Sequence, residues 1–182
     1  MLSEDFYALT FMSYKKENVK LYKLTSKQQA RYFQSCLWVF GVQLILLYLI
    51  CDEMLFQPIK DGRLTFHVPD VSTLFGQFFA CVLLHMELVG EVRQGIHMIR
   101  YVTNNPDKFT KPSVAILVGC MQALGGFWAE FVNIVVLAQR HNVQHCLQDF
   151  IAFELLTNVD NIYCETLPNF HLKESLKEEL HL

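Results

Sequence analysis

Three long apolar runs constrain the fold of this chain more than any other feature of its sequence. The first, residues 33–51, reads FQSCLWVFGVQLILLYLIC and contains no charged residue. A helix rises about 1.5 Å per residue, so such a run comes close to spanning the ~30 Å hydrocarbon core of a bilayer. The second run (71–90) and the third (113–139) are apolar with a few polar interruptions. We therefore expect an all-α integral membrane protein with three transmembrane helices.

The composition agrees with this class. The chain is 52% hydrophobic and 18% charged, whereas average globular chains carry about 25% charged residues. A net charge of −3 offers no basic footprint for nucleic acid. The six cysteines form no C-x-x-C pair, which argues against a disulfide framework or a thiolate zinc site. We expect no metal and no cofactor other than bound lipid. The structural alternative is a soluble helical bundle.

The chain divides into four parts. A polar N-terminal arm (1–32) precedes the membrane domain (33–139), whose second helix continues to about Tyr101. Residues 140–163 repeat apolar positions at helical spacing, which predicts an amphipathic helix on the membrane surface or against a partner. An acidic tail (164–182) ends the sequence.

Lysine and arginine residues predict the topology. Ten of them lie in the arm and in the 91–112 connection, against five in the 52–70 loop and in residues 140–182. The positive-inside rule then places the N-terminus inside and the C-terminus outside. The arm lacks the features of a secretory signal and the chain has no N-x-[ST] sequon. Together with the unpaired thiols, this favours the mitochondrial inner membrane.

The third run carries two patterns at helical spacing. Small residues four positions apart, which let another helix approach closely, form a ridge of Ala115, Gly119 and Ala123. A polar stripe interrupts the run at Gln122, Gly126, Glu130 and Asn133. Ionisable groups at membrane depth are costly, so the stripe predicts either an ion or proton path or a seam of interhelical hydrogen bonds.

Two further groups of polar residues bear on chemistry. His85, Glu87, Glu91 and Arg93 fit either the membrane–water boundary, which we favour, or a proton relay. A metal-enzyme hypothesis combines Glu87 with two histidines four residues apart, His141 and His145. It lacks an H-E-x-x-H arrangement and is the weakest hypothesis.

Residues of the amphipathic segment are candidates for docking to partner proteins. The set comprises Asp149, Phe150, Phe153, Asp160 and Tyr163. Asp149 and Asp160 bracket an apolar patch and lie about 16 Å apart along the helix. This separation suits a helix that docks to a partner better than it suits a catalytic pair.

The stretches EFVNIVVLAQ (130–139) and DFIAFELLTNVDNIY (149–163) resemble a pattern in uncharacterised multi-pass membrane proteins of protists. The resemblance rests on Glu130, Asn133, Phe150, Ala152, Asp160 and Tyr163. It covers about a quarter of the chain and departs at Asp149, where Asn is more usual, and at Asn158-Val159. It implies membrane placement and a shared packing motif, with no activity attached.

No nucleophile elbow, Walker loop or dinucleotide-binding glycine pattern occurs in the sequence. We therefore expect a non-catalytic accessory subunit of a large membrane complex, for example one of the mitochondrial respiratory type, with other membrane subunits and the bilayer as partners. The alternative is a small ion channel or transporter subunit whose polar stripe on the third span lines a path.

Overall fold

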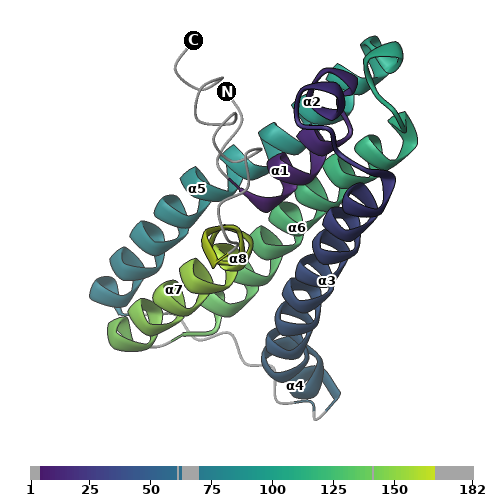
Figure 1. The fold of residues 1–182 in the computed structure, drawn as a ribbon. Coiled ribbons are helices and arrows are strands. Elements are labelled where there is room, and N and C mark those ends of the chain that lie inside the picture. The colour runs from purple at the N-terminus through teal and green to yellow at the C-terminus, as the bar shows by residue number, and fades with distance from the viewer. Residues whose placement is uncertain (1–4, 61, 63–69, 141, 167–182) are drawn as a thin grey trace.

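The computed structural model describes residues 5–60, 62, 70–140 and 142–166, and within them every regular element is a helix (Figure 1). One turn (η1) is a π-helix and another (η2) a 3₁₀ helix. The elements are α1 (Phe6–Ser13), α2 (Lys16–Leu21), α3 (Ser26–Cys51), η1 (Asp52–Phe56), α4 (Gln57–Lys60), α5 (Val71–Asn104), η2 (Pro106–Lys108), α6 (Pro112–Ala138), α7 (Val143–Thr157) and α8 (Val159–Thr166).

Three helices are long and apolar enough to cross a membrane, and they contain the three predicted runs, except that the third helix ends one residue earlier than predicted. They cover Ser26–Lys60, Val71–Asn104 and Pro112–Ala138. The first begins before the predicted run because Thr25 and Gln28 form a capping box there, and it continues through η1 and α4. The all-helical fold class and the presence of three candidate spans are thus confirmed.

The closest helix pair is α5 with α6, and two glycines set its spacing. A Cβ atom added at Gly95 of α5 would lie 2.7 Å from the backbone oxygen of Gly119 and 2.7 Å from the backbone nitrogen of Ala123. A Cβ atom at Gly119 would lie 3.0 Å from the backbone oxygen of Gly95. The small-residue ridge of α6 therefore faces α5, where only glycine at position 95 permits this approach.

Helix α1 is buried along its whole length, in contrast to the polar arm that we expected for residues 1–32. Its sequence FYALTFMS is apolar around the helix, and all eight residues are buried against α3, α6 and α8. Phe6 meets Tyr163 of α8 edge-on, with 5.0 Å between ring centroids. A segment this short with no polar face gives no amphipathic pattern in the sequence, so its burial is visible only in the fold.

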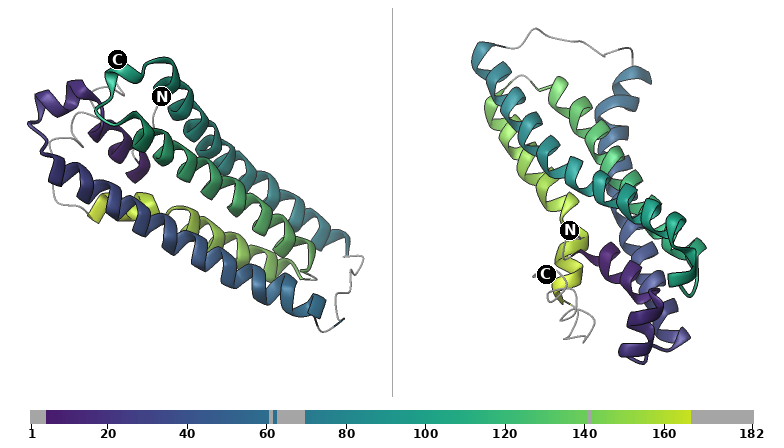
Figure 2. Two further views of the ribbon diagram at one scale, coloured as in Figure 1. Left: turned by 90° about the vertical axis from the view of Figure 1, so that its right-hand side faces the viewer. Right: turned by 90° about the horizontal axis from the view of Figure 1, so that it is seen from above.

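Helices α7 and α8 run back along the bundle from the end of α6 (Figure 2). Helix α7 packs against α5 and α6, and α8 reaches α1 and α3. Asn158 separates the two helices. The predicted amphipathic segment thus packs within the chain's own bundle, and the described chain ends beside α1.

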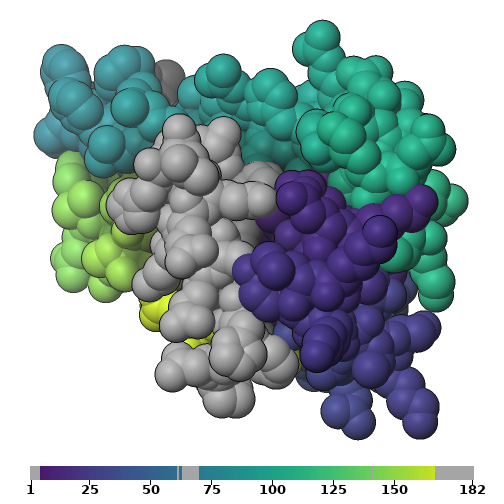
Figure 3. All heavy atoms as spheres, turned by 45° about the horizontal axis from the view of Figure 1, so that its top comes forward, coloured from purple at the N-terminus to yellow at the C-terminus, as the bar shows by residue number. Residues whose placement is uncertain are grey.

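One end of the bundle joins the N-terminal segment to the connection between α5 and α6. The Thr110 backbone N–H donates to the Tyr14 carbonyl (2.9 Å), and Gln29 Nε2 donates to the Ser13 carbonyl (2.8 Å). Figure 3 shows the N-terminal segment (purple) against the green residues of this connection. The two lysine- and arginine-rich segments that we assigned to the same side are therefore adjacent.

Candidate functional site

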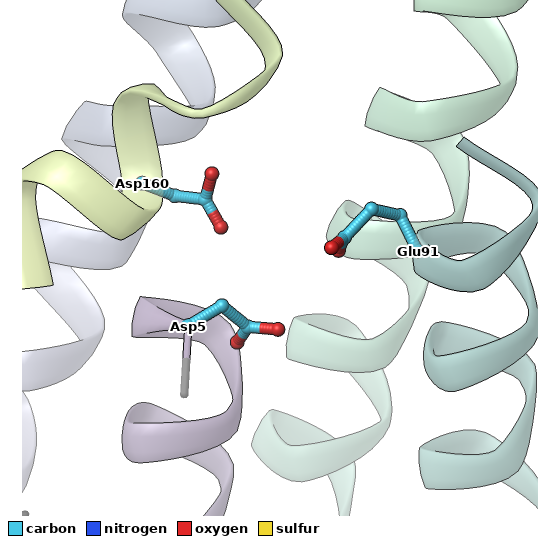
Figure 4. Close-up of side chains that lie close together, drawn as sticks. All are labelled: Asp5, Glu91 and Asp160. Carbon is cyan, nitrogen blue, oxygen red and sulfur yellow. The ribbon is translucent and has the colours of Figure 1, made fainter. Parts of the chain in front are cut away.

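Three carboxylates from distant parts of the sequence converge inside the bundle: Asp5, Glu91 and Asp160. One carboxylate oxygen of each lies within 4.8 Å of those of the other two. Asp5 precedes α1, Glu91 lies on α5 and Asp160 is in the first turn of α8, and their side chains point toward one another (Figure 4). Asp5 is 0% and Asp160 3% exposed, and Glu91 is partly buried. We call these residues the carboxylate trio.

Local sequence explains how two of the three carboxylates are positioned. Asp5 is the N-cap of α1, where its Oδ1 accepts a hydrogen bond from the Ala8 backbone N–H. Asp160 is the second residue of α8, which begins directly after Asn158, the C-cap of α7, so the first turn of α8 carries its side chain into the bundle. Both acids therefore sit at helix N-termini, where the helix dipole favours negative charge.

Glutamine side chains from the long helices donate to the trio. Gln94 Nε2 (2.8 Å) and Gln122 Nε2 (2.9 Å) both donate to Asp5 Oδ2. Gln122 Nε2 also donates to Glu91 Oε2 at 2.7 Å. One amide group thus bridges two carboxylates, which fixes their relative positions.

A third glutamine connects the trio to α1 and α3. The Tyr7 hydroxyl donates to Gln43 Oε1 (2.7 Å), which orients the Gln43 amide so that its Nε2 faces Asp160 Oδ1 at 3.4 Å. Burial raises the pKa of Tyr7, with the Cys36 thiol and the nearby carboxylates adding to the effect, so the hydroxyl remains a donor. The trio is therefore supported by side chains from α1, α3, α5 and α6.

The electrostatics of the trio oppose its full ionisation. At 4.8 Å and an effective dielectric constant of about 20, two carboxylates repel by about 3.5 kcal/mol. Burial, together with the charges of Asp5 and Glu91, raises the pKa of Asp160 to about 8. No ion pair between described residues includes Glu91 or Asp160. The trio therefore needs protons or a bound cation to be stable.

A cavity of about 30 Å³ adjoins the trio, which is room for a water molecule or a single ion. Glu91 and Asp160 line it, together with Tyr7, Gln43 and Gln122. Gln122 is 2% exposed, and its Oε1 has no hydrogen-bond partner within the described part of the chain. A buried carbonyl oxygen without a donor beside carboxylates is a group that a cation would satisfy.

The predicted polar stripe of α6 does not form one continuous path. Gln122 and Gly126 line the cavity, while Glu130 turns to the flank between α5 and α6 and contacts His85 Nδ1 at 2.9 Å. Asn133 is fully buried, and neither its Oδ1 nor its Nδ2 finds a partner among the described residues. The residues of the stripe therefore lie in three different places: the cavity, the flank between α5 and α6, and the buried interior.

The predicted docking residues all contact the chain's own helices. Asp149 forms a two-point ion pair with Arg140, and Phe150 and Phe153 pack into apolar clusters with α5 and α6 residues. Tyr163 packs on Phe6 and Asp160 belongs to the trio. These residues position α7 and α8 in the bundle.

The residues of the metal-enzyme hypothesis are not brought together. Glu87 accepts a hydrogen bond from Asn158 at 2.8 Å, at the far end of α7 from His145. Asn158 lies thirteen positions after His145 along this helix, which corresponds to a rise of about 20 Å. His141 lies outside the described residues.

Sequence reasoning missed the trio, although it noted each member separately. We expected Asp160 to dock a partner and Glu91 to lie at the membrane boundary, and Asp5 falls in the segment that we expected to be a polar arm. The available signal was a set of isolated polar residues in apolar surroundings, above all Gln43 and Gln122. Such residues need polar partners, but only the fold identifies them.

We compared the chain with known proteins by sequence and by structure. We find no match to the chain among protein-family models, among curated proteins or among solved structures.

Proposed function

We propose that the chain is an integral membrane protein whose helical bundle binds a cation at the carboxylate trio, as a small channel or transporter subunit would. The observation that carries this proposal is the meeting of three carboxylates inside the bundle, two of which have no ion pair among the described residues. Ionisable groups at membrane depth are expensive, and they commonly mark ion or proton sites.

Membrane insertion is supported by the outward faces of the long helices. Large apolar side chains are exposed along all three, including Trp38, Phe75, Phe78 and Phe127, each at least 60% exposed. A soluble protein rarely leaves so much contiguous apolar surface in water. In a bilayer these side chains would contact lipid.

The geometry of the trio fits an oxygen-preferring cation. Ca²⁺ binds oxygen ligands at 2.3–2.6 Å, so two ligands on opposite sides of the ion are separated by about 4.8 Å. The oxygen atoms of the trio are no farther apart than this. Protons would occupy the same oxygens when no metal is present.

The Gln122 side chain offers a further ligand. Rotating its amide by 180° exchanges Nε2 and Oε1 and turns the unsatisfied oxygen toward Asp5 and Glu91. In the protonated or metal-free state the amide nitrogen holds the carboxylates, and with a cation the oxygen completes the site. Carboxylate and amide oxygens together are ligands typical of Ca²⁺.

Flux through liposomes tests the proposal. We expect purified protein in liposomes to dissipate a Ca²⁺ or proton gradient faster than protein-free liposomes, and Glu91→Gln to abolish the difference. Glu87→Gln is the matched control, because Glu87 is an exposed residue on the same helix, one turn away, and outside the trio. Equal flux in the two variants, or no flux above the protein-free level, would contradict the proposal.

A second candidate function, an accessory subunit of a larger membrane complex, is favoured by the flank between α5 and α6. His85 and Glu130 pair there at 2.9 Å, and the His85 side chain is 58% exposed on a candidate span. A polar pair facing lipid is costly, so a neighbouring protein helix would cover it. Under this role, Glu130→Gln loosens the complex on a native gel and leaves flux unchanged. The mitochondrial inner membrane is our prediction for its location.

We also propose that the α1–α2 end of the bundle lies on the inside of the membrane. The lysine- and arginine-rich segments meet at the α1–α2 end of the bundle, which supports an inside position for that end. Because α7 and α8 return along the bundle, the described chain ends beside α1. Labelling of cysteines introduced at Lys20 and at Gln57 with an impermeant reagent would show on which side each end of α3 lies.

A further inference from the structure

A second cavity, of about 570 Å³, lies between α1 and the C-terminal part of α5 and does not involve the carboxylates of the trio. Its volume is in the range of small-molecule and lipid sites. The buried side chains that line it are Phe11, Met12 and Met98, with Gln94 beside them. We call this feature the basic groove.

The rim of the basic groove is cationic and polar. Lys15 and Arg100 line it, with His97, Tyr101, Asn104 and Asn105. Lys15 contacts Glu17 at 3.6 Å, and Arg93 Nε lies 3.4 Å from His97 Nε2. Arg100 is exposed and takes part in no ion pair between described residues. Another cation, Lys108, lies nearby, with its Nζ 5.6 Å from the centroid of the Tyr101 ring.

The groove lies at the end of the bundle where lysine and arginine residues gather. The α1–α2 segment and the connection that follows α5 are joined there by the Thr110–Tyr14 hydrogen bond. In a membrane-inserted chain this end would be at the level of the lipid headgroups, because residues 91–104 of α5 follow its apolar run. A groove with an apolar floor and a cationic rim at headgroup level is complementary to an anionic phospholipid.

We infer that the basic groove binds one anionic phospholipid, with the phosphate between Lys15 and Arg100 and an acyl chain along the groove, where Tyr101 provides exposed apolar surface. The apolar floor distinguishes this ligand from a free phosphate, which would need only the rim. The polar groups of Tyr101 and Asn104 then contact the glycerol and headgroup. The groove shares Gln94 with the cation site, since this side chain donates to Asp5, but it shares none of the charged residues. The two proposals therefore rest on different charged groups.

Lipid titration of the full-length protein in nonionic detergent tests the inference. Thermal unfolding followed by circular dichroism would be measured with phosphatidylglycerol, with phosphatidylcholine and with inorganic phosphate. We expect phosphatidylglycerol alone to raise the melting temperature in a saturable manner. Each Lys or Arg near a lipid surface contributes about 1 kcal/mol, or about fivefold in affinity, so Lys15→Gln with Arg100→Gln should weaken binding about 25-fold.

The control removes two cations from the same end of the molecule but outside the groove. Lys20→Gln with Lys27→Gln changes the net charge equally, and both lysines are exposed. We expect this variant to bind phosphatidylglycerol as the wild type does. An equal loss in both variants, equal stabilisation by phosphatidylcholine, or full stabilisation by inorganic phosphate would each overturn the inference. The comparison of ligands on the wild type decides the question even if a variant fails to fold.

Discussion

Replacing Asp160 by Asn should make the protein more stable at alkaline pH, although it removes a charged side chain. Burial and the neighbouring charges of Asp5 and Glu91 raise the pKa of Asp160 in the folded protein to about 8, compared with an ordinary value of 3.8. The folded state therefore holds a proton on Asp160 that the unfolded chain releases. This contribution to stability is complete below about pH 4 and is lost as the pH rises through 8.

The size of the effect follows from the two pKa values. Their difference corresponds to roughly 6 kcal/mol at about 1.4 kcal/mol for each pKa unit. Asn keeps an oxygen that can accept from Gln43, as Asp160 Oδ1 does. It is close in shape to protonated Asp and cannot ionise. At pH 9 the variant should exceed the wild type in unfolding free energy by several kcal/mol. At pH 5, about one unit above the ordinary pKa of Asp, the excess should be only about 1.5 kcal/mol.

Reversible unfolding in mixed micelles of a nonionic detergent and dodecyl sulfate, with a chelator present, would measure this difference at pH 5, 7 and 9. Asp107→Asn is the control, because Asp107 is an exposed acid in η2 and should leave the pH dependence unchanged. Added Ca²⁺ should restore the stability of the wild type at pH 9 but not change that of Asp160→Asn. Identical pH dependence in wild type and Asp160→Asn would refute the account of Asp160 as a proton-holding member of the trio.

Further predictions concern the packing of the bundle and the second candidate role. Gly95→Ala should disrupt the α5–α6 pair, at a cost of a few kcal/mol on thermal unfolding, because the new Cβ would meet backbone atoms at 2.7 Å. Gly90→Ala, with nothing within 4 Å of its new Cβ, should be neutral or stabilise by up to about 1 kcal/mol; similar losses in both variants would contradict the close-contact argument. Asn133→Leu should stabilise the protein by about 1–3 kcal/mol in the same assay, since it removes a buried amide whose two polar atoms have no described partner. A lower melting temperature for Asn133→Leu would mean that the amide has a partner in the membrane. Glu130→Leu should reduce co-purification of partner subunits in mild detergent without changing Ca²⁺ binding, and an unchanged set of partners would remove the argument for a covered flank.

The sequence predicted the parts of the fold that depend on long local patterns. The apolar runs were enough to predict the three long helices, because a segment that spans a membrane is long and nearly free of charge. The small-residue ridge at Ala115, Gly119 and Ala123 indicated a close helix contact, but its partner Gly95 belongs to a stretch of α5 with no such pattern. Predicting this contact would require knowing which faces of α5 and α6 meet.

The site was beyond sequence reasoning for a physical reason. Asp5, Glu91 and Asp160 are separated by most of the chain, and each has an ordinary local explanation as a cap, a boundary charge or a docking acid. Their proximity depends on α1 entering the bundle and on α8 returning to meet it. Both helices are only eight residues long, too short for a periodic pattern to predict their burial.

The stoichiometry of Ca²⁺ binding tests the cation site most directly. Equilibrium dialysis of the detergent-solubilised protein at pH 8.5 should give one Ca²⁺ per chain, accompanied by release of protons from the trio. Glu91→Gln combined with Asp160→Asn should abolish this binding, while Glu87→Gln should not. Absence of saturable binding up to about 1 mM, the weak end of protein calcium sites, or unchanged binding in the double variant would contradict the account.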